Sequence, residues 1–292
     1  RLQKRRTRYV ARHPHDLWHL DAKGPVRVRL KSGQTIEFHV LTVLDDASRA
    51  VLAVLVAPSP NLCAAVRVFR LAVKRWGLPS RFYLDRASIF DSYDFRTGLA
   101  ELGVHRIKAK PRNPQPNGKI EAYHRVLVAW FTGRLRGQQV VDLEHLQQLL
   151  DGVIEVVYQD HRNRSLKASP RSVLGNAVST RQVSAARVDG AFRKERSLKA
   201  HPVTGEVVVD GITYLVPETL RGLRLTFLVD PEPLVAPLVV HPASGEHLGL
   251  TRAAVAPTDL PAAPPPPTRW GRGPLQTLYD SWQGKTRPVA EP

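Results

Sequence analysis

The sequence predicts an α/β layer fold, followed by a small all-β barrel and a disordered, proline-rich tail. Three observations predict this order. Strand-like and helix-like apolar patterns alternate over residues 15–175, short and evenly spaced strand patterns fill residues 201–256, and nine prolines lie within residues 257–292. A basic arm, residues 1–14, precedes the first part, and a polar, basic linker, residues 176–200, follows it. We therefore expect more than one folded domain in the 292 residues.

The first predicted domain opens with three strands and then alternates helix and strand. Short polar turns join the three strand patterns, which favours an antiparallel meander over residues 16–21, 35–44 and 49–56. The elements expected after the meander are a helix at 61–76, a strand at 81–85, a helix at 94–102, a strand at 104–108, and helices from 118 and at 143–163. Asn61 is the expected N-cap of the first helix.

The second predicted domain and the tail have different compositions. Asp210-Gly211 lies between two β-branched runs, which favours a two-residue hairpin turn in the predicted barrel. The proline-rich composition of the tail is too poor in apolar residues to form a core. The same tail contains large apolar residues that have either no role or a role in docking to a partner, and we favour docking: Trp270, Leu275, Leu278, Tyr279 and Trp282.

Charge and cysteine content restrict the class of partner. Lys and Arg outnumber Asp and Glu by 43 to 26, a net charge of +17, so we expect a polyanionic partner, nucleic acid first and an anionic membrane surface second. No apolar run reaches the roughly 18 residues that a membrane span needs. Cys63 is the only cysteine, which excludes an internal disulfide and a cysteine-rich zinc site and fits a reducing cytoplasm. Because the sequence begins at Arg1 and has no Met, we expect it to be part of a longer protein.

Three carboxylates lie where an α/β sheet tends to place its chemistry. Asp21 and Asp85 end two predicted strands, and Glu121 lies in the first turn of the helix that begins at about residue 118. Each has an ordinary interpretation, a turn residue for the two Asp and compensation of the helix dipole for Glu121. Together they are the ligands that Mg²⁺ prefers, and two-metal phosphodiester chemistry needs such carboxylates to converge. Asp45 and Asp46 are interpreted as turn formers rather than ligands.

The local strings around these carboxylates resemble a known catalytic core. Thirty-five residues lie between Asp85 and Glu121, and the relevant strings are DLWHLD, VLDDASR, FYLDRAS and NPQPNGKIEAYHR. Over residues 15–175 they resemble the RNase H-like catalytic core of retroviral integrases and related transposases. The Arg-Ala-Ser that follows Asp85 departs from the Asn-Gly found in many relatives. The order of core, basic linker, barrel and tail is similar to the Mu-type transposases of phage Mu-like and CRISPR-associated transposons.

This resemblance implies a mixed five-stranded sheet flanked by helices and a metal-dependent activity. Asp21, Asp85 and Glu121 would be the ligands of two Mg²⁺ ions, for which Mn²⁺ is expected to substitute. The implied function is that of a DDE transposase or integrase, which cleaves 3′ ends of transposon DNA and transfers them to target DNA. Two alternatives stay open: a plain RNase H-like nuclease, and a catalytically inert DNA-binding assembly subunit.

The resemblance also implies partners and a cellular setting. A homo-oligomer would bind double-stranded DNA at paired transposon ends. A membrane is not among the expected partners. An AAA+ ATPase that selects target DNA would dock on residues 268–284 of the tail. The expected setting is the bacterial cytoplasm, in association with the nucleoid.

Candidate DNA-contacting residues surround the three carboxylates and lie in the arm. The arm, which includes Arg5 and Arg6, is either a solvated, disordered segment or a strap along the DNA backbone. Asn117 either caps the helix or contacts DNA. The other candidates are basic residues, some of which have the ordinary alternative of solvated charges: Arg86, Lys110, Arg112, Lys119 and Arg125.

Overall fold

The computed structural model describes residues 11–84, 92–108, 118–175, 180–233, 235–253 and 274–286. The chain divides into two units. The first, which we call the core unit, comprises Arg1–Ser184 with Arg269–Pro292, and the second, the β unit, comprises Ala185–Thr268.

A mixed five-stranded sheet forms the centre of the core unit, as predicted. Its order is β3-β2-β1-β4-β5, and its strands are β1 (Leu17–Arg29), β2 (Thr35–Asp45), β3 (Val51–Ala57), β4 (Arg81–Leu84) and β5 (His105–Lys108). The first three strands pair antiparallel, which confirms the meander, and β4 and β5 add in parallel beside β1. The sheet is therefore built from a meander and two crossover strands.

Strand β1 continues eight residues beyond the predicted end at residue 21. Its pairing with β2 is shifted between Lys23 and Val26, and Gly24 and Pro25 lie at that irregularity. Past it, Val26 and Val28 pack against the same apolar cluster as the helices. The bulge exchanges the two faces of the strand, so a simple alternation test ends the strand too early.

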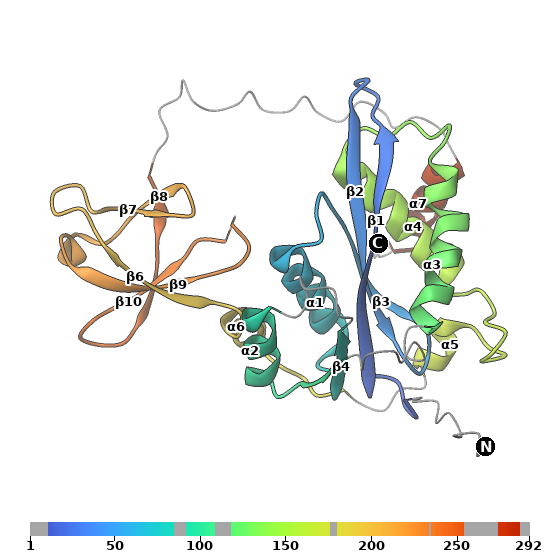
Figure 1. Ribbon diagram of the computed structural model, residues 1–292, viewed down its shortest axis with the longest axis horizontal. Coiled ribbons are helices and arrows are strands. Elements are labelled where there is room, and N and C mark those ends of the chain that lie inside the picture. The colour runs from blue at the N-terminus through green and yellow to red at the C-terminus, as the bar shows by residue number, and fades with distance from the viewer. Residues whose placement is uncertain are drawn as a thin grey trace, which may run out of the picture. The chain divides into compact units, whose positions relative to one another are not determined.

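Helices cover both faces of the sheet. Figure 1 shows α1 (Leu62–Trp76) on one side, and α3 (Gly118–Trp130) with α4 (Leu143–Gly152) on the other. Asn61 caps α1 as predicted, because its side chain accepts a hydrogen bond from the Ala64 amide at 2.9 Å. Helix α2 (Tyr93–Glu101) is capped by Ser92, one residue before its start, and its Phe95 joins an aromatic cluster with Phe69 and Phe82. None of the described helices is long and apolar enough to cross a membrane.

The helix predicted at 143–163 changes geometry partway along. Helix α4 ends at Gly152, and a π-helical turn, η2 (Val153–Tyr158), continues it. The next helix, α5 (Pro170–Gly175), starts at a proline, whose missing N–H costs nothing at that position.

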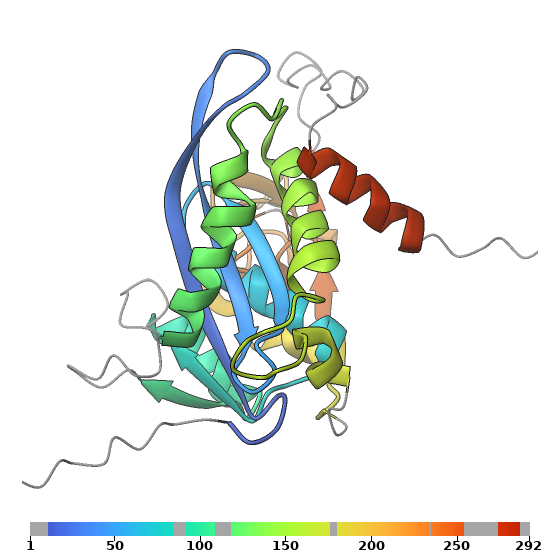
Figure 2. The same ribbon diagram turned by 90° about the vertical axis from the view of Figure 1, so that its right-hand side faces the viewer.

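The tail contains a helix that composition did not predict. Residues Pro274–Thr286 form α7, which lies against α4 and η2 (Figure 2). Leu275 is completely buried in the apolar cluster of the core unit, and Leu278 packs against it. The expectation of a disordered tail is therefore wrong for these residues, because apolar side chains at helical spacing supply a buried stripe that the composition of the whole tail conceals. The rest of the tail lies outside the described residues.

The β unit consists of antiparallel strands around one apolar core, as expected for a small all-β domain. A four-stranded sheet has the order β11-β10-β9-β6 and a three-stranded sheet the order β12-β8-β7. The strands are β6 (Lys194–Lys199), β7 (Glu206–Val209), β8 (Ile212–Leu215), β9 (Arg224–Val229), β10 (Leu238–Val240), β11 (His247–Gly249) and β12 (Thr251–Arg252), preceded by α6 (Ala185–Gly190). Their buried residues form one cluster that includes Tyr214 and Phe227.

Two sequence predictions for the β unit have different outcomes. Val209 pairs directly with Ile212 across Asp210-Gly211, both with positive φ, which confirms the hairpin. The assignment of residues 176–200 to a linker is wrong for Lys194–Lys199, because they form β6 and pair with β9. As an edge strand with mostly exposed side chains, β6 has no apolar alternation to mark it.

Candidate active site

Asp21 lies where β1 leaves its pairing with β4. The last described pair between these strands is Leu20 with Leu84, and the preceding β1 residues are buried. The side chain of Asp21 is 26% exposed, and its Oδ1 accepts a hydrogen bond from the Ala22 amide at 2.9 Å. The end of the buried segment of β1 therefore presents a partly solvated carboxylate. Asp85, the residue after β4, lies outside the described residues.

Glu121 is exposed in the first turn of α3 and lines a pocket of about 390 Å³. Further residues of the same helix line this pocket at helical spacing, namely His124, Arg125 and Val128, and Lys23 of β1 joins them. Nδ1 of His124 lies 3.6 Å from Oδ2 of Asp21. The two predicted ligands therefore flank the same histidine, one from β1 and one from α3.

His124 is neutral at neutral pH. Burial, reinforced by the positive charge of Lys23, lowers the pKa of His124 to about 4. Its Nε2 is buried and has no hydrogen-bond partner within the described part of the chain. The interaction with Asp21 is therefore not an ion pair at neutral pH, and His124 cannot attract a phosphate by charge.

Two inward-facing side chains attach α3 to the sheet on either side of Glu121. Nζ of Lys119 lies 2.5 Å from Oδ2 of Asp46, and the Thr42 hydroxyl donates to the Tyr123 hydroxyl at 3.1 Å. Lys119 and Tyr123 are four residues apart and so lie on one helix face, while Glu121 faces away from it. The direction of the Glu121 side chain therefore follows from the contacts of Lys119 and Tyr123, not from contacts that Glu121 makes itself.

Asp46 has a larger role than the predicted turn former. Its carboxylate is buried and accepts hydrogen bonds from Nε2 of His19 and from the Ala11 amide, both at 2.8 Å, besides that from Lys119. Burial by itself raises the pKa of Asp46, but the hydrogen bonds from His19 and Lys119 lower it, and their combined effect with the other contacts is larger than that of burial. The pKa of Asp46 therefore lies well below the ordinary value, and the carboxylate is ionised. Asp46 lies in the turn as predicted, and its side chain in addition joins three separate segments.

Asp45, in contrast, is the turn former that the sequence predicts. Its side chain accepts hydrogen bonds from the Ser48 amide at 2.8 Å and the Ser48 hydroxyl at 2.7 Å, which close the turn. It also accepts one from the His15 amide at 2.7 Å. Burial raises the pKa of Asp45. Nothing in the sequence of Asp45-Asp46 separates their two roles, because only distant segments distinguish them.

The predicted DNA-contacting residues are only partly described. Arg125 is exposed beside Glu121, whereas the ammonium group of Lys119 faces Asp46. The remaining candidates lie outside the described residues: Arg5, Arg6, Arg86, Lys110, Arg112 and Asn117. Within the described ranges, no group of three His, Cys, Asp or Glu is placed to hold a metal ion. The predicted set of three includes Asp85, so only two of its members, Asp21 and Glu121, have a described position.

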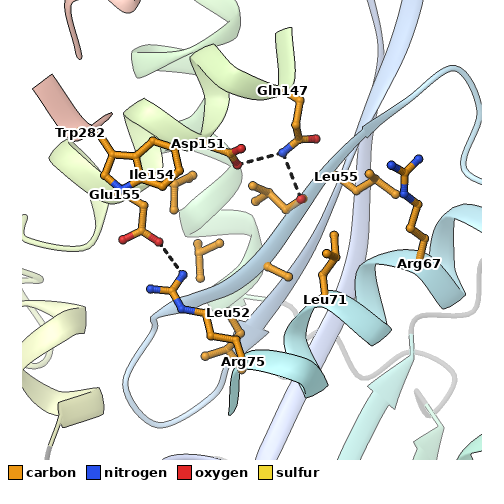
Figure 3. Close-up of a pocket in the computed structure, with 13 residues that line it drawn as sticks. Leu52, Leu55, Arg67, Leu71, Arg75, Gln147, Asp151, Ile154, Glu155 and Trp282 are labelled. Carbon is orange, nitrogen blue, oxygen red and sulfur yellow. Dashed lines mark hydrogen bonds and ion pairs between the residues drawn. The ribbon is translucent and has the colours of Figure 1, made fainter. Parts of the chain in front are cut away.

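A second pocket, of about 410 Å³, lies along the edge strand β3 (Figure 3). The Gln147 amide occupies the edge as a strand would, since its Oε1 accepts from the Val56 amide at 2.7 Å and its Nε2 donates to the Val54 carbonyl at 3.3 Å. Arg75 pairs with Glu155 at 2.8 Å, and Asp151 accepts from Gln147 at 2.9 Å. Both carboxylates of this pocket, Asp151 and Glu155, already have partners, so the pocket is not a second candidate active site.

Comparison with known proteins identifies part of the core unit. Residues 11–114 match the integrase core domain family. The matched range includes Asp21 and Asp85 and ends before Glu121. The match covers about a third of the chain.

Three of the solved structures that this chain resembles are retroviral integrases or contain one. The HTLV-2 integrase catalytic core domain, solved in complex with magnesium, is 15% identical, with a TM-score of 0.43 over 56% of this chain and 98% of that chain. The simian T-cell lymphotropic virus intasome, in complex with PP2A regulatory subunit B56 gamma, is 14% identical, with a TM-score of 0.48 over 85% of this chain and 81% of that chain. The BIV integrase catalytic core domain is 17% identical, with a TM-score of 0.40 over 55% of this chain and 93% of that chain. Residues 11–114 thus match an integrase core domain, and the mixed five-stranded sheet with flanking helices is the RNase H-like fold of such a core.

Proposed function

We propose that this chain is the catalytic subunit of a DNA transposase or integrase, which cleaves 3′ ends and transfers them to target DNA with divalent metal ions. One observation carries the proposal: next to an integrase-type sheet, His124 of α3 lines a pocket together with Glu121, and its Nδ1 lies 3.6 Å from Oδ2 of Asp21 on β1. The net charge of +17 suits DNA as the substrate.

The donor set fits Mg²⁺. Asp21 and Glu121 supply hard carboxylate oxygens at solvent-accessible positions, and no described Lys or Arg forms an ion pair with Glu121. Together with Asp85, they would hold the ions. When bound, a pair of such ions activates the attacking hydroxyl and stabilises the leaving oxygen of an in-line displacement.

The remaining side chains of the pocket bind and orient the DNA. Arg125 and Lys23 both line the pocket beside Glu121, so they are placed to pair with phosphates next to the cleaved bond. His124 is neutral and mostly buried, and its Nδ1 lies 3.6 Å from the Asp21 carboxylate. No protein nucleophile is required, because a water molecule or a DNA 3′-hydroxyl attacks the phosphate.

The partners in this proposal are double-stranded DNA and further copies of the chain, because two DNA ends must be joined to one target. The more specific assignment to Mu-type transposases, with an AAA+ ATPase bound to residues 268–284, must account for α7. Leu275 is fully buried against the core unit. An ATPase would therefore have to bind the exposed side of α7 or displace the helix.

A strand-transfer assay tests the proposal. The full chain is mixed with Mg²⁺ or Mn²⁺, pre-cut duplexes that carry free 3′-hydroxyls and a supercoiled target plasmid. We expect joined products, and we expect Asp21→Asn, Asp85→Asn and Glu121→Gln each to abolish them while DNA binding persists. Glu206→Gln, an exposed change in the β unit, is the matched control. Hydrolysis without joining would indicate a nuclease, and unchanged joining by Asp21→Asn would refute the catalytic assignment.

A further inference from the structure

We propose that Asp46 is a positioning residue of this active site, which holds Glu121 in place through Lys119 and Asp21 in place through His19. The inference rests on the proposed function and adds to it the group that sets the spacing between two of the ligands. Asp46 lies directly after β2 and belongs to neither of the elements that carry those ligands.

The Asp46 carboxylate divides its two oxygens between different segments. Oδ1 accepts from Nε2 of His19 on β1, and Oδ2 accepts from Nζ of Lys119 on α3 and from the Ala11 amide. The Asp46 side chain is 1% exposed and that of Lys119 is 16% exposed. An ionised group at this depth needs its partners, because an unpaired buried charge is strongly unfavourable.

Each contact acts two residues away from a predicted ligand. His19 and Asp21 are alternate residues of β1, so both side chains lie on the same face of the strand. Lys119 and Glu121 share the first turn of α3, where side chains two apart point in nearly opposite directions. When Lys119 faces Asp46, Glu121 consequently faces the pocket.

A second contact prevents α3 from turning about the first. The Tyr123 hydroxyl accepts from Thr42, and Thr42 is the residue of β2 that pairs with Asp21. The two contacts, at Lys119 and Tyr123, lie on either side of Glu121. A rotation or slide of α3 would break one of them, so together they set where Glu121 stands relative to Asp21.

The β unit provides a matched control for this buried ion pair. Arg193 lies 3.7 Å from Asp230, with side chains 17% and 1% exposed, almost the same as Lys119 and Asp46. Loss of the Arg193 charge removes a similarly buried, though longer, ion pair far in sequence from every predicted ligand. A stability effect shared by both pairs is thereby separated from an effect on metal binding.

The test measures Mn²⁺ binding to the full chain without DNA, by the electron paramagnetic resonance signal of free Mn²⁺, together with the thermal midpoint. The variants are Lys119→Met, Lys119→Arg, the double variant Asp46→Asn with Lys119→Met, and Arg193→Met, with Asp21→Asn to identify the site. We expect Lys119→Met to weaken Mn²⁺ binding about 10- to 100-fold, the usual effect of losing a group that orients metal ligands. Lys119→Arg should retain most of the affinity, because it keeps the charge.

The double variant and the control separate positioning from stability. The double variant leaves no lone buried charge, so we expect its thermal midpoint to recover while Mn²⁺ affinity stays low. It carries the same test should Lys119→Met not fold. Arg193→Met should lower stability without changing Mn²⁺ affinity. Wild-type Mn²⁺ affinity in the Lys119→Met and double variants would overturn this inference alone, whereas a wild-type chain without any Mn²⁺ site that Asp21→Asn removes would overturn the proposed function and this inference with it.

Discussion

Gly152 of α4 lies directly against the backbone of Tyr279 in α7, so close that a Cβ on Gly152 would be 2.7 Å from the Tyr279 Cα and amide nitrogen. No side chain other than hydrogen fits there. The contact explains why a glycine stands at the junction of α4 and the π-helical turn η2. It also shows that α7 packs closely against the backbone at this junction.

The first prediction concerns this glycine. Replacing a helical Gly by Ala ordinarily stabilises a helix by about 0.5–1 kcal/mol. At Gly152 we expect the opposite sign, a loss of about 1–3 kcal/mol, because the new methyl group overpacks the interface with α7. Urea unfolding measures the difference, with Gly175→Ala as the control, since among the described residues no atom outside its chain neighbours and its own helix backbone lies within 4 Å of a Cβ there. A stabilised Gly152→Ala variant would show that α7 does not occupy this surface in solution.

The second prediction concerns the anchor of α7. Leu275 is completely buried in the core cluster, so Leu275→Ala should cost about 2–5 kcal/mol of unfolding free energy. Thermal and urea unfolding of the full chain measure the change. Val208→Ala, at an exposed position of the β unit, should cost much less. If the two variants were equally stable, Leu275 would be available for an external partner instead.

The third prediction is a pH dependence at Asp151. Burial raises the pKa of Asp151 to about 6 in the folded chain, from 3.8 for the free group. The folded state therefore prefers the protonated form, and the wild type loses stability as pH rises from about 4 to 6, with the full penalty present above that range. Asp151→Asn removes the penalty, so it should stabilise the chain by about 1–3 kcal/mol at pH 8 and have little effect at pH 4.

Urea unfolding at both pH values checks the Asp151 prediction. Asp160→Asn is the comparison, because Asp160 is exposed and already paired with Arg171 at 2.8 Å. We expect no gain in stability from that change at either pH. If Asp151→Asn destabilised the chain more at pH 8 than at pH 4, the change in stability would have the wrong sign for a buried carboxyl group with a raised pKa.

The fourth prediction concerns phosphate binding by Arg125. This residue is exposed at the pocket beside Glu121. Arg125→Ala should weaken binding to duplexes of any sequence and reduce the slope of log affinity against log salt by about one. Fluorescence anisotropy between roughly 50 and 200 mM salt gives that slope. Arg67→Ala, on α1 at the second pocket, should leave the slope unchanged if DNA follows the α3 side.

Much of the fold follows from signals that lie within a few residues of one another. Asn61 caps the Ala64 amide three residues on, and Asp210-Gly211 joins two paired strands directly. The three strands of the meander and the start of α3 at Gly118 are equally local. Such features can be read from sequence because the atoms that interact are held close by the chain itself.

The elements that sequence reasoning missed have a local signal that is absent or concealed by the residues around it. Strand β6 is polar and exposed, and it is a strand only because β9 lies beside it. The bulge at Gly24 reverses the alternation of β1 and hides its second half. The apolar residues of α7 lie at helical spacing but within a proline-rich tail, which conceals them. The contact that places the helix is distant, because His145 and Gln276 form a hydrogen bond of 2.9 Å across 131 positions of sequence.

Local sequence therefore decided the types of most elements and placed two carboxylates at candidate catalytic positions, Asp21 near the end of a buried strand segment and Glu121 in a first helical turn. Tertiary packing alone decided what holds them. Lys119 reaches Asp46 across 73 positions, and Tyr123 meets Thr42 across 81. Contacts of this kind form only when distant segments bury polar groups together, because a buried charge or hydroxyl must find whichever partner the completed fold brings to it.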